Sequence, residues 1–280
     1  MNKITIVGAG RVGESTAQTI AKAELCREIV LIDIKEGMPQ GTALDIQESA
    51  PQFGFDTKLA GSNNMDAMAG SNLVINTAGL PRKPGMSRSD VLDTNLKIMD
   101  GIVDKMVEVA PNAMLMVVTN PVDVLTYAAW KRSGWSRNRI FGMAGVLDSS
   151  RMASFVAMET GYSVKDISAM VMGGHGDTMV PMTRFTCVNG ISVDQLLSQD
   201  KIDQIVERTR GGGAEILALK QNSSAYDAPA AAIGAMVSAI SHDRNRILPV
   251  VAALDGEYGQ SDICMGVPVV LGAKGMEKII

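Results

Sequence analysis

The chain has 280 residues, of which 46% are hydrophobic and 20% charged, enough for one large or two ordinary domains with a substantial core. Its 26 Lys and Arg against 30 Asp and Glu give a net charge of −4. This balance argues against a nucleic acid partner, because no basic excess exists to neutralise phosphates. No apolar run reaches the ~18 residues of a membrane span, so we expect a soluble, cytoplasmic chain with no membrane partner. Two histidines and three scattered cysteines predict neither a metal site nor a disulfide framework.

The first half of the chain alternates the signals of buried strands and of helices. Short apolar runs at 3–7, 28–34, 73–77 and 114–118 predict strands, and helical spacing of apolar residues predicts helices over 12–22 and 90–110. Apolar strands separated by helices are typical of a parallel sheet covered on both faces. We therefore predict an α/β fold with an N-terminal doubly wound parallel sheet of the Rossmann type over residues 1–144.

The second half has a different character. A helix near 147–161 is followed by strand-like runs at 167–172 and 179–188, and Asn189-Gly190 is a strong hairpin signal. Helices follow around 201–220 and 228–242, and the tail from 247 returns to short strands punctuated by glycine. These signals predict a C-terminal α+β domain over 145–280. No flexible linker separates the halves, so we expect them to share a large interface.

A glycine-rich turn lies between the first predicted strand and the first predicted helix. It reads Gly8-Ala9-Gly10-Arg11-Val12-Gly13 and matches the dinucleotide fingerprint G-x-G-x-x-G. The first glycine permits a tight turn, the second lets the backbone approach a pyrophosphate, and the third lets the helix pack on the strand. Asp33, twenty residues after the turn, would accept hydrogen bonds from the adenosine ribose and repel a 2′-phosphate, which favours NAD over NADP. The alternative is a turn of this shape that binds nothing.

Two other segments have the composition of a ligand loop. Gly211-Gly212-Gly213 follows no strand and lies inside a helical pattern, so we expect a helix break or kink there. The segment after the strand at 73–77 contains two prolines, two glycines and three cations, Arg82, Lys83 and Arg88. It is either a solvated charged loop or a lid that closes on an anion.

Two polar segments of the second half are candidates for catalysis. Asp148 and Arg151 would share a helix face, and on that pattern alone a surface ion pair is favoured. His175 follows a predicted strand among three glycines, which give its ring room and a ligand close access. The residue is therefore a candidate acid/base, with a purely structural histidine as the alternative.

Together these segments resemble the lactate/malate dehydrogenase family and, within it, the lactate-dehydrogenase-like malate dehydrogenases. The resemblance runs along essentially the whole chain. Its most specific pieces are AGLPRKPGMSR at 78–88, VTNPVD at 118–123, GMAGVLDSSR at 142–151 and GGHGD at 173–177. It implies NAD-linked, reversible oxidation of (S)-malate to oxaloacetate, a step of the tricarboxylic acid cycle, without a metal.

The resemblance also implies roles for individual residues. His175 would exchange a proton with the substrate oxygen, and Asp148 would orient His175. Arg151 would clamp the carboxylate next to the reacting carbon. Further substrate contacts would come from Arg88, Asn120 and, for the distal carboxylate of a dicarboxylate, Arg82. The nicotinamide end of the cofactor site would be lined by Asn95, Val118, Thr119 and Asn120, and the Asn120-Pro121 bond is a candidate cis peptide.

Family members usually continue beyond residue 280 with a further helix, so we expect that helix to be missing here. The resemblance also suggests a homodimer or homotetramer. Three alternatives stay open. A lactate-type 2-hydroxyacid dehydrogenase would differ at Arg82, where an uncharged Gln is usual. An NAD-dependent glycosidase would want Cys and His metal ligands, and a non-enzymatic NAD-sensing module would not need His175.

Overall fold

The computed structural model describes residues 1–80 and 88–280, with side chains in the second stretch from residue 91 onward. Its helices are α1 (Arg11–Lys22), α2 (Met38–Glu48), α3 (Ala50–Phe53), α4 (Arg88–Val109), α5 (Val122–Ser133), α6 (Gly145–Thr160), α7 (Gln199–Lys220) and α8 (Asp227–Ser241). Its strands are β1 (Lys3–Val7), β2 (Glu28–Ile32), β3 (Lys58–Ser62), β4 (Leu73–Asn76), β5 (Met114–Val117), β6 (Ile140–Gly142), β7 (Ile167–Ser168), β8 (Val171–Gly173), β9 (Met179–Pro181), β10 (Cys187–Val188), β11 (Ile191–Ser192), β12 (Arg246–Asp255), β13 (Ser261–Gly272) and β14 (Gly275–Ile279).

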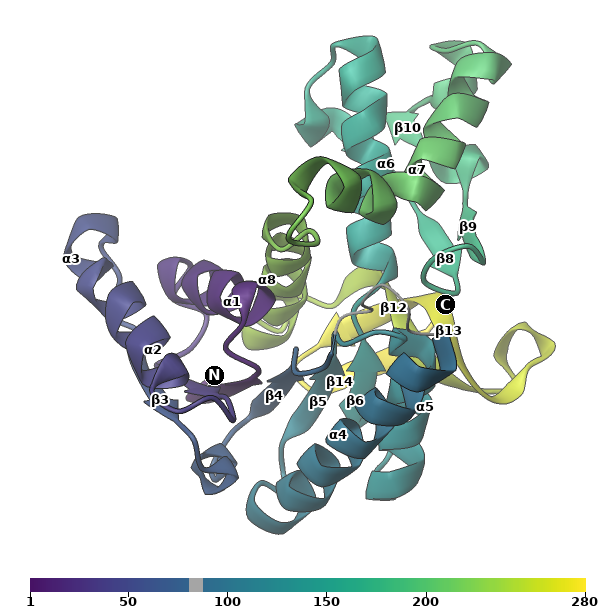
Figure 1. The fold of residues 1–280 in the computed structure, drawn as a ribbon. Helices are drawn as coiled ribbons and strands as arrows, with labels where there is room; N and C mark the ends of the chain where they lie inside the picture. Colours follow the sequence, from purple (N-terminus) through teal and green to yellow (C-terminus); the bar gives the residue numbers. More distant parts are fainter. Residues whose placement is uncertain (81–87) are drawn as a thin grey trace.

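The predicted parallel sheet is confirmed, and it is wound in both directions from β1. Its parallel part has the order β3-β2-β1-β4-β5-β6 (Figure 1). The carboxyl ends of these strands meet at one edge, where ligands bind in folds of this kind. The glycine-rich turn after β1, Asp33 after β2, and the loops after β4 and β5 therefore all reach the same edge of the sheet.

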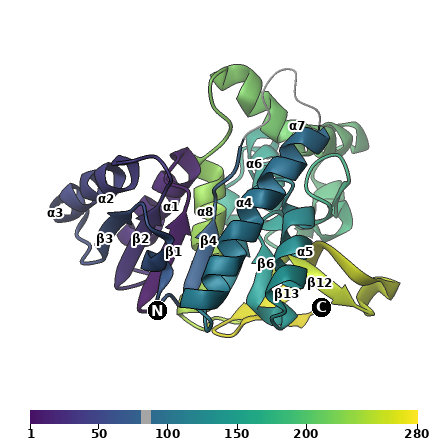
Figure 2. The same cartoon turned by 60° about the horizontal axis from the view of Figure 1, so that its bottom comes forward.

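The two halves of the chain share one sheet and one core. Beyond β6 the sheet continues through the antiparallel strands β12, β13, β8 and β9. On one face, α8 of the second half lies beside α1 of the first (Figures 1 and 2), close enough that a Cβ on Gly234 would lie 2.7 Å from Cγ2 of Thr19. A buried cluster joins β1, α1, α8 and β12, whereas α4 and α5 cover the opposite face (Figure 2). The expected large interface is therefore present.

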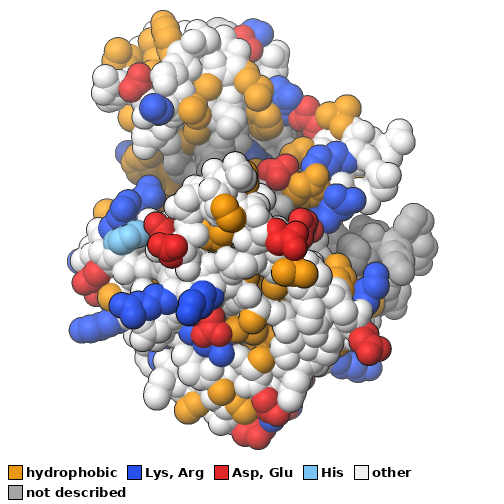
Figure 3. All heavy atoms as spheres, turned by 90° about the vertical axis from the view of Figure 1, so that its left-hand side faces the viewer, with side chains coloured by type: hydrophobic (Ala, Val, Ile, Leu, Met, Phe, Trp, Pro, Cys, Tyr) orange, Lys and Arg blue, Asp and Glu red, His pale blue; other side chains and the backbone are white. Residues whose placement is uncertain are grey.

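From the side of α2 and α3, the surface is hollowed between the lobe that holds α6 and α7 and the body that holds α1 to α3 (Figure 3). Charged side chains of both signs are interspersed on this face. In the described part of the chain, no helix is long and apolar enough to cross a membrane.

Several details differ from the sequence-based expectations. The run at 167–172 divides into β7 and β8, which belong to different sheets, and only the ends of the run at 179–188 form strands. The Asn189-Gly190 hairpin is confirmed, since β10 and β11 pair through Val188 and Ile191. The tail forms long strands of 10 and 12 residues rather than short ones, because β12 and β13 pair with each other over nearly their whole length.

The expectation of a break or kink at Gly211-Gly212-Gly213 is met only in part: α7 is not broken, since it is helical from Gln199 to Lys220, but its axis turns sharply partway along (Figure 1). A bidentate ion pair spans the glycines: Arg208 donates from Nε and Nη2 to the two carboxylate oxygens of Glu215, at 3.0 and 2.7 Å. The Arg208 guanidinium also holds the pKa of Glu215 below its usual value. This contact compensates in part for the low helix propensity of glycine.

Candidate active site

The candidate acid/base, His175, follows β8 and faces the first turn of α6. Its ring atom Nδ1 lies 2.9 Å from Oδ2 of Asp148, whose side chain is 2% exposed, against 19% for His175. A carboxylate on Nδ1 selects the tautomer and orientation of the ring, so Nε2 becomes the nitrogen that exchanges a proton with a ligand. The predicted pairing of the two side chains is thus present in the structure.

Asp148 contacts Arg151 through its other oxygen. Arg151 Nη1 donates to Asp148 Oδ1 at 2.9 Å, and the Arg151 side chain is 11% exposed. The pair is therefore not the surface ion pair that the local pattern favoured. Asp148 lies in the first turn of α6, where the helix dipole stabilises a negative charge. One buried carboxylate thereby holds both a histidine and an arginine in fixed positions.

Asp123, at the start of α5, belongs to the same cluster and was given no role by the sequence analysis. The Oδ2 atom of Asp123 accepts a hydrogen bond from the backbone N–H of His175 at 3.0 Å. Its Oδ1 is buried and has no hydrogen-bond partner among the described residues. Burial raises the pKa of the Asp123 carboxyl, and the same carboxylate adds to the burial that raises the pKa of the Cys264 thiol to about 12. The only sequence signal for Asp123 was its place at the end of the VTNPVD motif.

Asn95 joins the loops that follow β4 and β5. Its side-chain oxygen accepts from the backbone N–H of Leu80 at 2.8 Å, and its Nδ2 donates to the backbone oxygen of Asn120 at 2.9 Å. The hydroxyl of Thr119 donates to the Ala78 oxygen at 2.7 Å, and the N–H of Val118 donates to the Asn76 oxygen. The predicted nicotinamide-end residues Asn95, Val118, Thr119 and Asn120 are therefore neighbours. The Asn120-Pro121 bond is cis, as expected.

The glycine-rich turn has the geometry that the fingerprint requires. Gly8 has a φ of +102°, which favours glycine, and a Cβ there would lie 2.7 Å from the backbone nitrogen of Ala78. A Cβ on Gly13 would lie 1.9 Å from the Gly8 oxygen, so only glycine lets α1 approach β1 this closely. Gly10, the N-cap of α1, has open space around its Cβ position. The turn thus offers an unobstructed helix N-terminus, which fits the pyrophosphate of a dinucleotide.

Asp33 lies directly after β2 and is tied to this turn. Its Oδ2 accepts from the backbone N–H of Ala9, and its Oδ1 accepts from that of Lys35, both at 2.9 Å. Arg11 begins α1, with its guanidinium 5.5 Å from the centroid of the Tyr226 ring, and Val12 packs against the main core. All seven predicted residues of the adenosine and pyrophosphate site are therefore brought together.

Two predicted substrate contacts lie outside this description. Arg82 is not among the described residues, and of Arg88 only the backbone is described, at the first position of α4. In the described part of the chain, no group of three or more His, Cys, Asp or Glu side chains could hold a metal ion.

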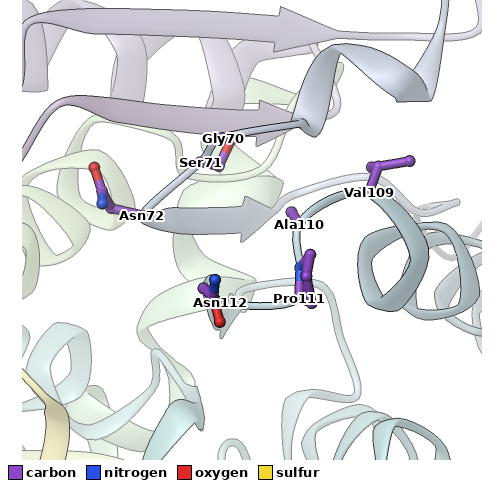
Figure 4. Close-up of a pocket in the computed structure, with 7 residues that line it drawn as sticks. All are labelled: Gly70, Ser71, Asn72, Val109, Ala110, Pro111 and Asn112. Atoms are coloured by element: carbon purple, nitrogen blue, oxygen red, sulfur yellow. The ribbon is translucent and has the colours of Figure 1, made fainter.

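A separate hollow of about 280 Å³ lies at the opposite edge of the sheet (Figure 4). Its lining comes from Gly70–Asn72, before β4, and Val109–Asn112, before β5. Asn72 is already engaged there, because its side-chain oxygen accepts from the backbone N–H groups of Asn2 and Lys3. This hollow therefore does not contribute to the acid/base cluster or to the glycine-rich turn.

Comparison with protein families gives two adjoining matches. The NAD binding domain of lactate/malate dehydrogenase matches residues 2–142, and the alpha/beta C-terminal domain of lactate/malate dehydrogenase matches residues 145–280. Among curated relatives, a malate dehydrogenase of Thioalkalivibrio sulfidiphilus is 66% identical over 280 residues, which are 100% of this chain and 91% of that protein. One of Nitrosococcus oceani is 63% identical over 100% of this chain and 90% of its own length.

Solved structures of both kinds of enzyme have this fold. Malate dehydrogenase from Salinibacter ruber has a TM-score of 0.95 at 48% identity, covering 99% of this chain and 88% of that one. Lactate dehydrogenase from Cryptosporidium parvum, complexed with lactic acid and NAD, also has a TM-score of 0.95, at 40% identity over 100% of this chain and 89% of that one. Backbone similarity therefore does not separate the two substrates.

Proposed function

The chain belongs to the lactate/malate dehydrogenase family, and on that premise we propose that it oxidises (S)-malate reversibly to oxaloacetate with His175 as the acid/base. Residues 2–142 are its NAD-binding domain. The observation that carries the proposal is the buried carboxylate of Asp148, which contacts His175 with one oxygen and Arg151 with the other. This arrangement places a proton donor beside a cation that can bind a carboxylate, which is what a 2-oxo acid requires.

When bound, the reduced cofactor supplies a hydride for the carbonyl carbon. His175 then gives its Nε2 proton to the carbonyl oxygen, and in malate oxidation it takes that proton back. Asp148 holds the ring in place and stabilises the imidazolium that forms in the oxidative direction. Arg151 binds the carboxylate next to the reacting carbon. Its position relative to His175 is fixed, because both side chains contact Asp148.

The remaining contacts follow the family pattern. Asn120 hydrogen-bonds the substrate, and Arg88 polarises its carbonyl. Arg82 pairs with the distal carboxylate that distinguishes oxaloacetate from pyruvate. Asn95, Val118 and Thr119 line the nicotinamide end of the cofactor site, and the glycine-rich turn with Asp33 holds the adenosine and pyrophosphate. We further propose a cytoplasmic homodimer or homotetramer, whose mass light scattering would measure.

The proposal is tested by NADH oxidation with oxaloacetate, pyruvate and 2-oxoglutarate in parallel. We expect rapid loss of NADH absorbance with oxaloacetate and slow loss with the other two. A preference for pyruvate would instead support the lactate-type activity of the Cryptosporidium parvum neighbour. If no 2-oxo acid were reduced while NADH still bound, the chain would be a binding module.

A further inference from the structure

The buried face of α7 changes character halfway along the helix. Ile202, Ile205 and Thr209 pack their side chains against the rest of the lobe, and the next position on that face is Gly212. Gly212 is itself buried, whereas its neighbour Gly211 is exposed. Glycine is the least favourable helix residue apart from proline, so a glycine on a buried face in the middle of a 22-residue helix calls for a physical reason.

The space beside Gly212 is filled by Arg151 of α6. A Cβ on Gly212 would lie 3.1 Å from Cδ and 3.5 Å from Nε of Arg151, and a Cβ on Gly213 would lie 3.7 Å from Nη2. By contrast, a Cβ on Gly211 would have no heavy atom within 4 Å. The guanidinium therefore lies against bare helix backbone, in a recess formed by Gly212 and Gly213 that we call the glycine notch.

The Arg151 guanidinium is held on one side by Asp148 and on the other by the glycine notch. Arg151 Nη1 is bound to Asp148, so one end of the group is fixed relative to His175. Its Nε is buried and has no hydrogen-bond partner among the described residues. The side of the group that carries Nε is therefore held by close packing against α7 rather than by a hydrogen bond.

We propose that Gly212 is a positioning residue for the substrate carboxylate. Its missing side chain lets Arg151 sink into the notch, which sets the distance between the guanidinium and His175. The inference rests on the proposed function, in which Arg151 binds the carboxylate beside the reacting carbon. It also gives a physical reason for a glycine at a buried position of α7, where a larger residue would favour the helix.

The test compares matched substitutions one residue apart, Gly212→Ala and Gly212→Val against Gly211→Ala and Gly211→Val. A methyl group at Gly212 forces Arg151 to shift by a few tenths of an ångström, and we expect the KM for oxaloacetate to rise about threefold to tenfold. Valine should lower kcat/KM by about a hundredfold, since a misplacement near 1 Å has that effect. The Gly211 variants should keep wild-type kinetics, and the affinity for NADH, measured by fluorescence titration, should stay unchanged in all four.

Binding of oxalate to the enzyme–NADH complex provides a readout without turnover. We expect weaker oxalate binding in Gly212→Ala and unchanged binding in Gly211→Ala, with both variants folded by circular dichroism. Equal effects of the two alanine variants, or wild-type KM and oxalate affinity in Gly212→Ala, would overturn the inference. If Gly212→Val fails to fold, the alanine pair decides. Failure of the proposed function would be seen separately, because the wild type would then not reduce oxaloacetate. Oxalate binding by the Gly212 and Gly211 variants could still be compared in that case.

Discussion

The proposed cofactor site and the proposed catalytic cluster are built in contrasting ways. The first is formed by one contiguous turn, residues 8–13, whose shape is set by backbone sterics at Gly8 and Gly13, with Asp33 as its side-chain anchor. The second takes single residues from separate segments, Asp123, Asp148 and His175, and joins them through partly buried hydrogen bonds. A turn can be recognised from spacing alone, whereas a cluster exists only after the chain has folded.

This difference predicts how each region responds to substitution. Isosteric changes should leave the shape of the glycine-rich turn intact. Replacing the charged Asp33 beside it should instead alter which cofactor binds. In the catalytic cluster, loss of one polar atom should abolish a contact that nothing else can replace. Substitutions inside and outside the two regions, taken below from the largest expected effect to the smallest, test this distinction.

His175→Asn should have the largest effect. Asparagine has a similar size and cannot transfer a proton, so we expect kcat to fall by about 10³- to 10⁴-fold, the upper range for a general acid/base. The affinity for NADH should not change, because His175 is not among the residues proposed to hold the cofactor. Stopped-flow NADH oxidation and fluorescence titration measure the two quantities. Near-normal turnover in this variant would mean that another residue transfers the proton.

The same role predicts opposite pH dependences in the two directions. Oxaloacetate reduction consumes a proton donated by His175, so its kcat/KM should fall as pH rises. Malate oxidation needs the neutral ring, so its kcat/KM should fall as pH decreases. Parallel pH profiles in both directions would contradict the assignment of His175.

Arg82→Gln tests substrate choice. In its proposed role, Arg82 would face a methyl group in a site closed on pyruvate. One-sided loss of a buried charge pair costs roughly 3–5 kcal/mol, about two to four orders of magnitude in kcat/KM. We expect Arg82→Gln to lose most oxaloacetate activity and to gain pyruvate activity. Lys83→Gln, the control, should do much less. An unchanged substrate preference in Arg82→Gln would assign the distal carboxylate to another residue.

The strands and helices show how much of the fold could be predicted from the sequence. Strands β1, β2, β4 and β5 and the long helices α4, α7 and α8 were predicted because each presents a continuous or periodic apolar signal. Helices α2 and α5 and strand β3 were not predicted. The edge strand β3 reads Lys-Leu-Ala-Gly-Ser and is set by tertiary contact, since Gly61 lies against the backbone of Pro39 on α2. Local composition carries no trace of such a contact.

The candidate site shows the same limit. The pairing of His175 with Asp148 was inferred from a family resemblance and is present in the structure. Asp123 was missed because its partner is a backbone N–H 52 residues away, and one N–H looks like any other in a sequence. At Gly211-Gly212-Gly213 the helix bends but does not break, for a related reason. Propensity describes a helix by itself, whereas this one is stabilised by an ion pair along it and by Arg151 packed against it.

Asp33→Ser addresses the charge in the cofactor turn. A carboxylate beside a 2′-phosphate costs several kcal/mol when solvent is excluded, and less at this half-buried position. We expect kcat/KM with NADPH to rise about 10- to 100-fold relative to that with NADH. Glu36→Ser removes an exposed carboxylate nearby and serves as the control. Equal use of both cofactors by the wild type would refute the role of Asp33.

Asp123 separates a positioning contact from a chemical one. Asparagine keeps an acceptor for the His175 N–H, so we expect kcat/KM of Asp123→Asn within about threefold of wild type. It also removes a carboxyl group whose pKa is raised by burial, so we expect a melting temperature that is equal or higher. Alanine removes the acceptor and should lower kcat/KM by about tenfold. If Asp123→Asn were as impaired as His175→Asn, the charge itself would take part in the reaction.

The smallest expected effect lies where the halves meet away from both sites. Arg137 donates to the two carboxylate oxygens of Glu257 at 3.0 and 2.7 Å and lowers the pKa of Glu257 to about 2. A depressed pKa of this kind stabilises the fold above pH ~4.5, and the stabilisation is lost as pH falls toward 2.

Because both side chains are partly exposed, we expect a contribution of only about 1 kcal/mol. Only about half of this contribution is lost by pH 3, because the folded-state pKa of Glu257 is about 2. Urea unfolding at pH 7 and pH 3 should therefore show a loss roughly 0.5 kcal/mol smaller in Glu257→Gln than in the wild type, with unchanged kcat/KM. An equal loss in both proteins would show that this ion pair adds nothing to stability, and a changed kcat/KM would show that the junction of the halves is coupled to the catalytic cluster.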